Sequence, residues 1–331
     1  ICAVLFYFLL APAAFAAEKL TVMLDWFVNP DHGPLIIAKE KGFFKARDLD
    51  VEFIAPADPN DPPKLVAAGK ADIAVSYQPQ LHLHHAQGLP LVRIGTLIAA
   101  PLNSVVVLAD GPVKSLADLK GKTVGFSVGG FEDALLGAML EKNGLKLSDV
   151  KLVNVNFALS SALMSRKVDA VIGAFRNFEL NQLNLEGKPG RAFYPEESGV
   201  PPYDELILIA HKDKALKDKR LRGFIDGLTE ASLWIANRPD ESWAIFRDTN
   251  KAELDTELNR RAWHETVGRF NLSPGALDRV RYRRFAEFLK QRNLIKQIPS
   301  LDQYAIDHEL PFPKLDVLPA KQYARCPSVA Q

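Results

Sequence analysis

Leu24-Asp25-Trp26-Phe27-Val28-Asn29-Pro30-Asp31-His32 lies where a predicted strand gives way to a predicted helix, and this stretch decides the fold. Apolar side chains alternate over residues 19–24, as in a half-buried strand, and a helix is expected from 35 until Gly42. Open α/β sheets bind ligands at the carboxyl ends of their strands. The sequence therefore predicts that Asp25 and Trp26 face a ligand, although a lone tryptophan here is more often a core residue.

Strand and helix patterns alternate from Lys19 to Pro202, which predicts an α/β protein with two lobes, each a mostly parallel sheet flanked by helices. Further strands are expected at 50–54, 72–77, 122–127, 151–155 and 169–175, with helices at 65–68, 80–87, 131–142 and 160–166. Asp31 and Asp61 are the expected N-caps of the helices that follow them. Residues 71–77 and 168–175 share one pattern, in which an acidic residue precedes an apolar strand and an aromatic side chain, so an internal repeat is indicated.

Two stretches that contain proline, 101–104 and 201–204, each precede an apolar strand and are expected to cross between the lobes. From residue 213 the pattern becomes helical, with helices expected at 240–247, 253–261 and 276–292. The predicted division is a signal peptide over 1–16, lobe 1 over 17–103 and 205–310, lobe 2 over 104–204, and a Pro-rich tail over 311–331.

The first seventeen residues carry no charge, and Ala14-Phe15-Ala16 has the small-x-small pattern of a secretory cleavage site. A membrane anchor is the alternative, but the apolar run is short for a span. A lipoprotein is disfavoured because Cys2 precedes the apolar stretch. Cleavage near Ala16 would leave Cys326 as the one cysteine, without an internal disulfide or a cysteine metal site, and predicts a periplasmic location.

The 331 residues are 47% apolar and 24% charged, which is typical of a soluble globular protein, and the net charge of +1 predicts no general attraction to nucleic acid or anionic membrane. His82, His84 and His85 lack acidic partners at a metal-site spacing, so packed or surface histidines are favoured over a metal site. The arginines of 279–284 are more simply the solvated face of a helix. No catalytic nucleophile motif or dinucleotide-binding glycine motif occurs, so neither catalytic residues nor a cofactor are expected.

Strand ends from both lobes are expected to line the cleft between them. The four segments are Asp25-Trp26, Tyr77-Gln78, Ser127-Val128-Gly129-Gly130 and Phe175-Arg176-Asn177-Phe178-Glu179. Aromatic faces and carboxylates suit a flat nitrogen heterocycle, because rings stack on the former and amino groups donate to the latter. Backbone N–H groups of 127–130 lie at a helix start, where they form a weak, generic site for an anion or a carbonyl oxygen. The alternative is that all of these are ordinary strand-end residues.

The opening stretch, together with residues 40–44, 71–77, 115–122 and 127–132, resembles the thiamine-pyrimidine solute-binding proteins of ABC importers, a family related to the eukaryotic pyrimidine synthase of thiamine biosynthesis. The resemblance covers about residues 19–310. Segments 40–44 and 115–122 are shared with nitrate, sulfonate and taurine binders, whereas the opening stretch is more specific. The resemblance implies a type II periplasmic-binding-protein fold that closes on formylaminopyrimidine or hydroxymethylpyrimidine.

The resemblance also implies roles for individual residues. Trp26 would stack on the ring, Asp25 would bond its edge, and Tyr77 would assist. From lobe 2, Glu179 would supply the carboxylate, and Phe175, which lacks a tyrosine hydroxyl, and Asn177 are further candidates. The expected ligand-binding set is completed by three residues of the glycine-rich segment, namely Ser127, Gly129 and Gly130.

The function that the resemblance implies is that of a non-enzymatic, monomeric binding protein that delivers its ligand to an ABC permease in the inner membrane. Hinges are expected at 102–105 and 203–206. Riboflavin or an alkylsulfonate are alternative ligands, and a pyrimidine-forming enzyme that uses His32 is an alternative of another class. The synthase branch uses a cysteine-rich motif and consumes a histidine, so the lack of a cysteine cluster and the expected export signal disfavour the enzyme.

Overall fold

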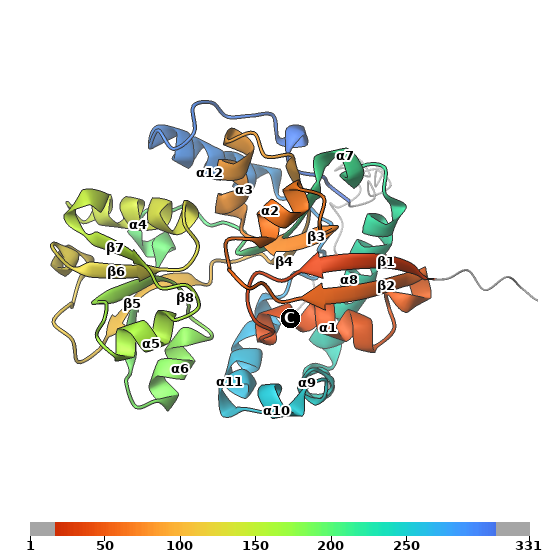
Figure 1. Ribbon diagram of the computed structural model, residues 1–331, viewed down its shortest axis with the longest axis horizontal. Coiled ribbons are helices and arrows are strands. Elements are labelled where there is room, and N and C mark those ends of the chain that lie inside the picture. The colour runs from red at the N-terminus through yellow and green to blue at the C-terminus, as the bar shows by residue number, and fades with distance from the viewer. Residues whose placement is uncertain (1–16, 309–331) are drawn as a thin grey trace, which may run out of the picture.

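The computed structural model describes residues 17–308, which form two α/β lobes side by side. Figure 1 shows lobe 1 on the right, with both the first strands and the C-terminal helices, and lobe 2 on the left. The expected signal peptide, the Pro-rich tail and Cys326 lie outside the described residues. Over residues 17–308, no helix has the length and apolar character needed to cross a membrane.

Each lobe is built on a mixed sheet of five strands. The sheet of lobe 1 has the order β2 (Leu49–Ile54), β1 (Glu18–Met23), β3 (Ile73–Ser76), β10 (Leu206–His211) and β4 (Leu91–Ile98). The sheet of lobe 2 has the order β7 (Lys151–Asn154), β6 (Thr123–Phe126), β8 (Ala170–Phe175), β5 (Asn103–Leu108) and β9 (Gly190–Phe193). The two sheets therefore repeat one topology, in which β1 corresponds to β6 and β3 to β8.

The predicted fold class is confirmed, with one refinement of strand direction. In lobe 1, β1 is parallel to β2 and β3, whereas β10 is antiparallel to β3 and β4. Lobe 2 repeats this pattern, since β5 is antiparallel to β8 and β9. β5 and β10 enter their sheets directly from the other lobe instead of through a covering helix, which is why they can run against their neighbours.

The internal repeat extends to side chains. Asp72 Oδ2 accepts a hydrogen bond from the backbone N–H of Thr21 at 3.0 Å, and Asp169 Oδ2 accepts one from Thr123 at 2.9 Å. Each aspartate thus lies just before the central strand of its sheet and ties it to the neighbouring parallel strand. This is the acidic position that the sequence comparison of 71–77 with 168–175 singled out.

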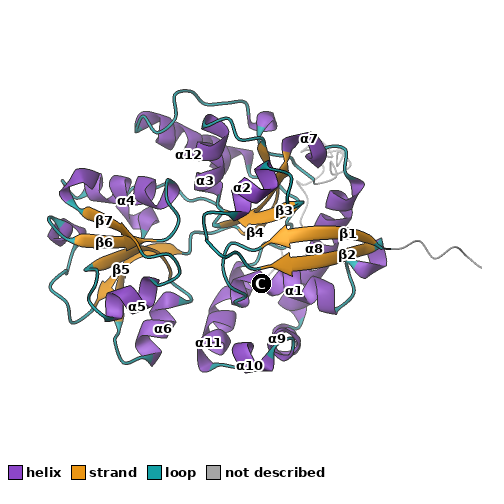
Figure 2. Ribbon diagram, viewed as in Figure 1, coloured by secondary structure: helices purple, strands orange, loops and turns teal. Residues whose placement is uncertain are grey.

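Helices flank both sheets, as Figure 2 shows. Lobe 1 carries α1 (Gly33–Glu40), α2 (Pro62–Ala67) and α3 (Gln78–Ala86), and lobe 2 carries α4 (Phe131–Lys142), α5 (Leu159–Met164) and α6 (Glu179–Leu185). The C-terminal part adds α7 (Lys212–Ala215), α8 (Lys219–Asn237), α9 (Pro239–Asp248), α10 (Lys251–Leu254), α11 (Glu257–Thr266) and α12 (Arg279–Gln291) to lobe 1. Helix α8 packs against α1, and Phe224 of α8 stacks on Phe44, shortly after α1, with ring centroids 4.8 Å apart.

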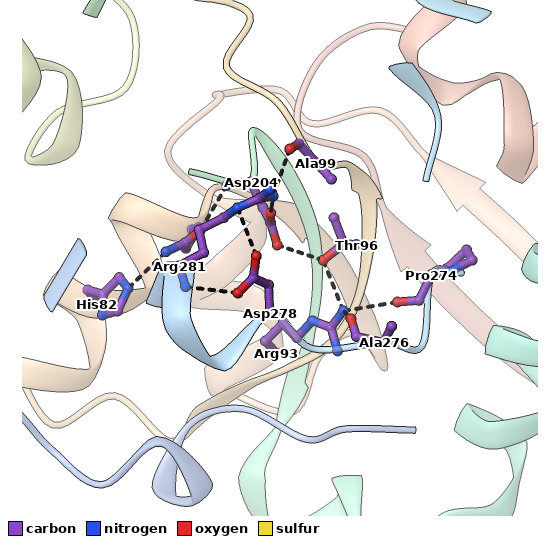
Figure 3. A network of polar contacts seen from close by, with 10 residues as sticks. His82, Arg93, Thr96, Ala99, Asp204, Pro274, Ala276, Asp278 and Arg281 are labelled. Atoms are coloured by element: carbon purple, nitrogen blue, oxygen red, sulfur yellow. Dashed lines mark hydrogen bonds and ion pairs between the residues drawn. The ribbon is translucent and has the colours of Figure 1, made fainter. Parts of the chain in front are cut away.

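A buried polar network connects Asp204 of the second crossing, and Ala99 just before the first, to the C-terminal part of lobe 1 (Figure 3). Arg93 is fully buried on β4 and donates to Thr96 Oγ1, which in turn donates to Asp204 Oδ2 at 2.9 Å. Arg281 of α12 pairs with Asp204 and donates to the carbonyl oxygen of Ala99 at 2.7 Å. The arginine run of 279–284 is therefore not simply a solvated face, because Arg281 joins Asp204 of the second crossing to Ala99, which lies just before the first.

Glu205, the next residue along the second crossing, also holds the first one. Its Oε2 accepts from the backbone N–H groups of Leu102 at 2.6 Å and Asn103 at 2.8 Å, and from the hydroxyl of Tyr203 at 3.1 Å. Burial raises the pKa of Glu205 to about 7 despite these bonds. The two connections between the lobes are thus bonded to each other.

Candidate ligand-binding site between the lobes

A cavity lies between the lobes, at the carboxyl ends of the parallel strands of both sheets. Its wall consists of Asp25, Trp26, Asn29, Asp31 and Tyr77 from lobe 1, and of Glu132, Gly173, Phe175, Phe178 and Glu179 from lobe 2. Five residues of the expected ligand-binding set are among them, namely Asp25, Trp26, Tyr77, Phe175 and Glu179. The repeated topology brings them together, because equivalent strand ends of the two sheets face each other.

Asp25 is held in the wall by two neighbours. The hydroxyl of Tyr77 donates to Asp25 Oδ2 at 2.8 Å, and burial together with the Asp25 charge raises the pKa of Tyr77, so the phenol stays protonated. His32 Nε2 lies 2.9 Å from Asp25 Oδ1, while His32 Nδ1 accepts from the backbone N–H of Asn29. Because a backbone N–H can only donate, Nε2 carries the imidazole proton and donates to Asp25.

The turn after β1 differs from the sequence prediction in its cap. Asn29 is the N-cap, since its Oδ1 accepts from the backbone N–H of Asp31 at 2.8 Å. The predicted cap, Asp31, is instead in the cavity wall, with its carboxylate buried. Asp61 does occupy an N-cap position, but its side chain makes no capping hydrogen bond.

Trp26 lies at the boundary of the two lobes. Its ring meets Phe157 of lobe 2 edge-on, with centroids 4.5 Å apart, and contacts Phe27 at 5.7 Å. A second contact between aromatic rings of the two lobes joins Tyr77 to Phe131, which stack with centroids 4.6 Å apart. The indole is therefore half-buried beside the cavity and is not enclosed within the interior of one lobe.

Asp31 is bonded to lobe 2 as well as to its own lobe. Asn177 Nδ2 donates to Asp31 Oδ1 at 2.7 Å, and Thr266 Oγ1 of α11 lies 3.2 Å from the same oxygen. Burial raises the pKa of Asp31 to about 6, although the bond from Asn177 lowers it. Asn177 thus positions a carboxyl group of the wall and does not itself line the cavity.

Lobe 2 contributes two buried glutamates. Glu179 Oε2 accepts from the backbone N–H of Phe175 at 2.7 Å, and burial raises the pKa of Glu179 to about 8. Glu132 Oε2 accepts from the backbone N–H of Ser127 at 2.8 Å, and burial raises the pKa of Glu132 well above its usual range. Burial thus favours the neutral form of both carboxyl groups, and Glu179, in its protonated form at neutral pH, can donate as well as accept a hydrogen bond.

Gly173 makes room for Glu132. The strand β8 is bulged there, since Ser104 pairs with Ala174 and Val105 with Ile172, and Gly173 has a φ of +98°. A Cβ atom on Gly173 would lie 2.5 Å from Glu132 Oε1. A glycine is thus required by both the backbone conformation and the space that the carboxyl group fills.

The wall of the cavity is acidic and aromatic. It holds four carboxyl groups and four aromatic rings, and no lysine or arginine is among its residues. Such a wall accepts N–H donors, and its protonated carboxyl groups can also donate to a ring nitrogen. An anionic group would face the carboxylates without a cationic partner, which is unfavourable in a buried site.

The glycine-rich segment has a different place from the one expected. The backbone N–H of Gly129 donates to Asn60 Oδ1 at 3.0 Å, that of Ser127 to Glu132, and that of Gly130 to Asp133 Oδ1 at 2.7 Å. Ser127, Gly129 and Gly130 are outside the cavity wall, and their N–H groups already have acceptors. The N–H groups that were expected to bind an anion or a carbonyl oxygen at this helix start therefore donate to the protein's own side chains.

Sequence reasoning did not assign Asn29, Asp31, Glu132 and Gly173 to the cleft, and it named Phe178 only as part of the cleft-lining segment 175–179. Signals for some of them were present. Glu132 ends the 127–132 segment on which the family resemblance rests, and Gly173 interrupts a strand that is otherwise apolar. Asp31 directly follows Pro30 and was interpreted only as a cap.

The histidine group of α3 is packed against aromatic side chains. His82 is buried beside Phe285, Tyr282 and Tyr304, with ring centroids between 5.2 and 5.6 Å away. Burial lowers the pKa of His82 to about 3, so the imidazole is neutral. Within residues 17–308, no group of three or more histidine, cysteine or acidic side chains is arranged to hold a metal ion.

Residues 29–242 match the family described as NMT1/THI5 like. The chain belongs to this family. A Haemophilus influenzae protein whose name assigns it to thiamine biosynthesis is 54% identical over 296 residues, which are 89% of this chain and 94% of that relative. The formylaminopyrimidine-binding protein of Halalkalibacterium halodurans is 35% identical over 253 residues, or 76% of each chain.

More distant members of the family are enzymes by name. The 4-amino-5-hydroxymethyl-2-methylpyrimidine phosphate synthase of Legionella pneumophila is 24% identical over 267 residues, which are 79% of this chain and 83% of the synthase. Family membership by itself thus leaves both binding and synthesis open.

Solved structures establish the fold. The alkanesulfonate-binding protein SsuA of Xanthomonas axonopodis pv. citri has a TM-score of 0.67 at 17% identity and covers 87% of this chain and 96% of its own. A Candida albicans protein described as having the generic periplasmic binding protein fold has a TM-score of 0.69 at 18% identity, covering 88% and 97%. This chain has the periplasmic-binding-protein fold, as the sequence resemblance implied.

Proposed function

We propose that this protein is the solute-binding component of an ABC importer, and that it captures a thiamine pyrimidine precursor, formylaminopyrimidine or hydroxymethylpyrimidine, in the cavity between its lobes. The protein would act as a periplasmic monomer and hand its ligand to a permease in the inner membrane, without chemical change. The observation that carries the proposal is the acidic and aromatic wall, which has no lysine or arginine.

An aminopyrimidine matches this wall group by group. Its ring can stack on Trp26, and its amino group can donate to Asp25. The amino group and the neighbouring ring nitrogen form a donor–acceptor edge, and a protonated carboxyl group offers the complementary acceptor and donor. Glu179, with a pKa of about 8, has this form at neutral pH. The formylaminopyrimidine-binding relative supports the same ligand class.

The wall disfavours the alkylsulfonate alternative. A sulfonate is anionic at every physiological pH and would need cationic or N–H donors in a buried site. The wall contains four carboxyl groups and neither lysine nor arginine, so a buried sulfonate would have no cationic partner there. The likeness to an alkanesulfonate-binding protein therefore supports a shared scaffold and not a shared ligand.

The surroundings of His32 disfavour the enzyme alternative. The imidazole is fully buried, and both of its nitrogens are engaged, one with Asp25 and the other with the backbone of Asn29. It is not among the residues of the cavity wall. A histidine that reacts during pyrimidine synthesis would have to leave both partners first, so a positioning role behind Asp25 is the better interpretation.

The proposal includes the division of the chain. Lobe 1 would comprise residues 17–103 and 205–310, lobe 2 residues 104–204, and closure would occur by rotation about 102–105 and 203–206. The bonds of Glu205 to Leu102 and Asn103 support this hinge, because they keep the two crossing segments together. A ligand that contacts both lobes stabilises the closed form by its differential affinity.

Isothermal titration calorimetry of the mature chain tests the proposal against a panel of formylaminopyrimidine, hydroxymethylpyrimidine, riboflavin and an alkanesulfonate. We expect saturable binding of one or both pyrimidines and none of the sulfonate. Incubation of the bound pyrimidine with the protein should return it unchanged. Binding of the sulfonate alone, or a new pyrimidine product, would refute the proposal. Recovery of the protein from a periplasmic fraction tests its location.

A further inference from the structure

Besides the cavity wall, the two lobes are joined by asparagine side chains that reach from one lobe to the other. We propose that Asn60, and Asn177 together with Asn181, are clasps that set the affinity of the cavity by stabilising the contact between the lobes, without touching the ligand. The affinity part of this inference rests on the proposed function, whereas its conformational part does not.

The Asn60 clasp uses every polar group of its side chain. Asn60 lies in the loop between β2 and α2 of lobe 1. Its Nδ2 donates to the carbonyl oxygen of Ser127 at 3.0 Å, and its Oδ1 accepts from the backbone N–H of Gly129 at 3.0 Å. Asp58 Oδ1 accepts from both the backbone N–H and Nδ2 of Asn60 at 2.8 Å, and so orients the amide toward lobe 2.

The Asn177 clasp works in the opposite direction, from lobe 2 to lobe 1. Asn177 Nδ2 donates to Asp31 at 2.7 Å and lies 2.6 Å from Thr266 Oγ1. One helical turn on, Asn181 Nδ2 donates to the carbonyl oxygen of Asn177 at 3.0 Å and to Glu265 Oε1 at 2.8 Å. Asn181 belongs to α6, and Asn177 lies in the turn between β8 and α6. Helix α6 lies beside α11 of lobe 1 in Figure 1.

Both clasps act on the open–closed equilibrium because their partners belong to the other lobe. When the lobes separate, these amides exchange protein partners for water. Each bond therefore stabilises the closed form by its net free energy, and this stabilisation is lost when the amide is removed. Ligand binds the closed form, so the apparent Kd is the intrinsic Kd divided by the closed fraction. Removing the side chain of Asn60 or of Asn181 therefore raises the apparent Kd, and neither of these amides is bonded to a residue of the cavity wall.

The central experiment compares Asn60→Ala with Asn237→Ala. Asn237 is a matched control, because its Nδ2 donates to Leu233 within the exposed end of α8, away from the lobe boundary. Small-angle X-ray scattering of the ligand-free protein should give a larger radius of gyration for Asn60→Ala and an unchanged one for Asn237→Ala. Titration with formylaminopyrimidine should give about 3- to 10-fold weaker binding for Asn60→Ala, mainly through faster dissociation.

Two further variants sharpen the test. Asn60→Asp keeps an acceptor for Gly129 but places a carboxylate against Asp58 and the carbonyl of Ser127, so it should open the lobes at least as much as Asn60→Ala. Asn181→Ala should weaken binding by a similar factor, and the double variant Asn60→Ala/Asn181→Ala should multiply the two factors.

The outcomes separate the two proposals. An unchanged radius of gyration in both Asn60→Ala and Asn181→Ala overturns the clasps, as does an unchanged Kd with a larger radius. If formylaminopyrimidine fails to bind the unmodified protein, the proposed function fails, and the scattering comparison still decides whether the clasps hold the lobes together. Equal thermal stability of Asn60→Ala and Asn237→Ala excludes a general loss of folding.

Discussion

The loops after β1 and β6 occupy equivalent places in two sheets of the same topology, yet their residues make different contacts. The loop after β1 supplies Asp25 and Trp26 to the cavity wall. The loop after β6 contains Ser127 and Gly129, which face Asn60 of the other lobe and are outside the wall. An equivalent position at a strand end thus places a residue near the cleft but does not decide whether it meets the ligand or the opposite lobe.

The central strands of the two sheets show the same division. In the aligned segments, Ser76 of β3 corresponds to Gly173 of β8. Ser76 is a regular strand residue whose hydroxyl donates to Gln80 within lobe 1 at 2.9 Å. Gly173 is the bulged position against which the Glu132 carboxyl group packs. Lobe 2 therefore departs from the regular strand at the point where it adds a carboxyl group to the site.

Of the substitutions that test this comparison, Gly173→Ala should have the largest effect on the free energy of unfolding. A Cβ atom would lie 2.5 Å from Glu132 Oε1, and a φ of +98° is strained for any residue with a Cβ. We expect a loss of about 3 kcal/mol in the free energy of unfolding, from strain and overpacking together. Ser76→Ala, the matched change in lobe 1, should cost about 1 kcal/mol. Urea unfolding measures both, and equal losses would refute the special role of Gly173.

Trp26→Ala tests whether the loop after β1 contributes more to ligand affinity than the loop after β6. Loss of the indole removes about 1–3 kcal/mol of stacking on a bound ring, or roughly 5- to 150-fold in Kd for a pyrimidine. Ser127→Ala removes a hydroxyl that bonds within lobe 2 to Asn156, so its Kd should stay within about 3-fold of the unmodified value. Calorimetric titration with formylaminopyrimidine distinguishes them. A larger effect of Ser127→Ala would reverse the assignment of the two loops.

The contribution of two buried carboxyl groups to stability, one in each lobe, should fall as the pH rises. The folded-state pKa is raised to about 6 for Asp31 in lobe 1 and to about 8 for Glu179 in lobe 2. The folded protein therefore binds more protons than the unfolded chain above the usual carboxyl pKa. The contribution of each group is fully present below about pH 4 and declines until its folded pKa is passed, by up to about 1.4 kcal/mol per pH unit.

Glu179→Gln should remove the part of this decline that extends to pH 8, whereas Asp31→Asn should flatten only the part below pH 6. Urea unfolding of the ligand-free protein at closely spaced pH values measures the slopes. An unchanged slope between pH 6 and 8 in Glu179→Gln would mean that Glu179 is ionised in the folded protein, and the donor role assigned to it would fail.

The sequence predicted those parts of the site that depend on strand order. Asp25, Trp26 and Tyr77 follow strands whose alternation or apolar run is visible locally, and parallel strand ends meet at one edge of a sheet. The glycine-rich segment looked equally suitable, because its N–H groups lack acceptors within the segment itself. The N–H groups of Ser127 and Gly130 bond to Glu132 and Asp133 of the following helix. The N–H of Gly129 and the carbonyl oxygen of Ser127 bond to Asn60, 69 and 67 residues away, and no local pattern reveals such a pairing.

Asp31 and Gly173 were missed for a related reason. Asp31 was interpreted as a cap because asparagine and aspartate compete for this role with nearly equal preference, and Asn29 takes it in the structure. Gly173 became meaningful only when Glu132, from a different helix, was found beside it. Local propensity fixes the elements, whereas these assignments depend on contacts between distant segments.

The smallest effect concerns the turns that lead into β3 and β8. After α2 the chain turns at Gly69 with a φ of +69°, and after α5 it turns at Arg166 with a φ of +57°. In both turns the next residue bonds back into the helix, from Lys70 to Leu65 and from Lys167 to Ala162. At this pair of turns lobe 1 has a glycine and lobe 2 an arginine, and the left-handed conformation costs a residue with a Cβ about 1 kcal/mol.

Arg166→Gly should therefore raise the free energy of unfolding by up to about 1 kcal/mol, and Gly69→Ala should lower it by a similar amount. Arg166 also pairs with Asp110 at 3.1 Å, but both side chains are exposed and the pair contributes little. Arg166→Ala is the control, because it removes the pair and keeps the strained backbone. If Arg166→Gly is no more stable than Arg166→Ala, the two turns are not equivalent. The structural repeat would then include the two sheets but not the turns that lead into β3 and β8.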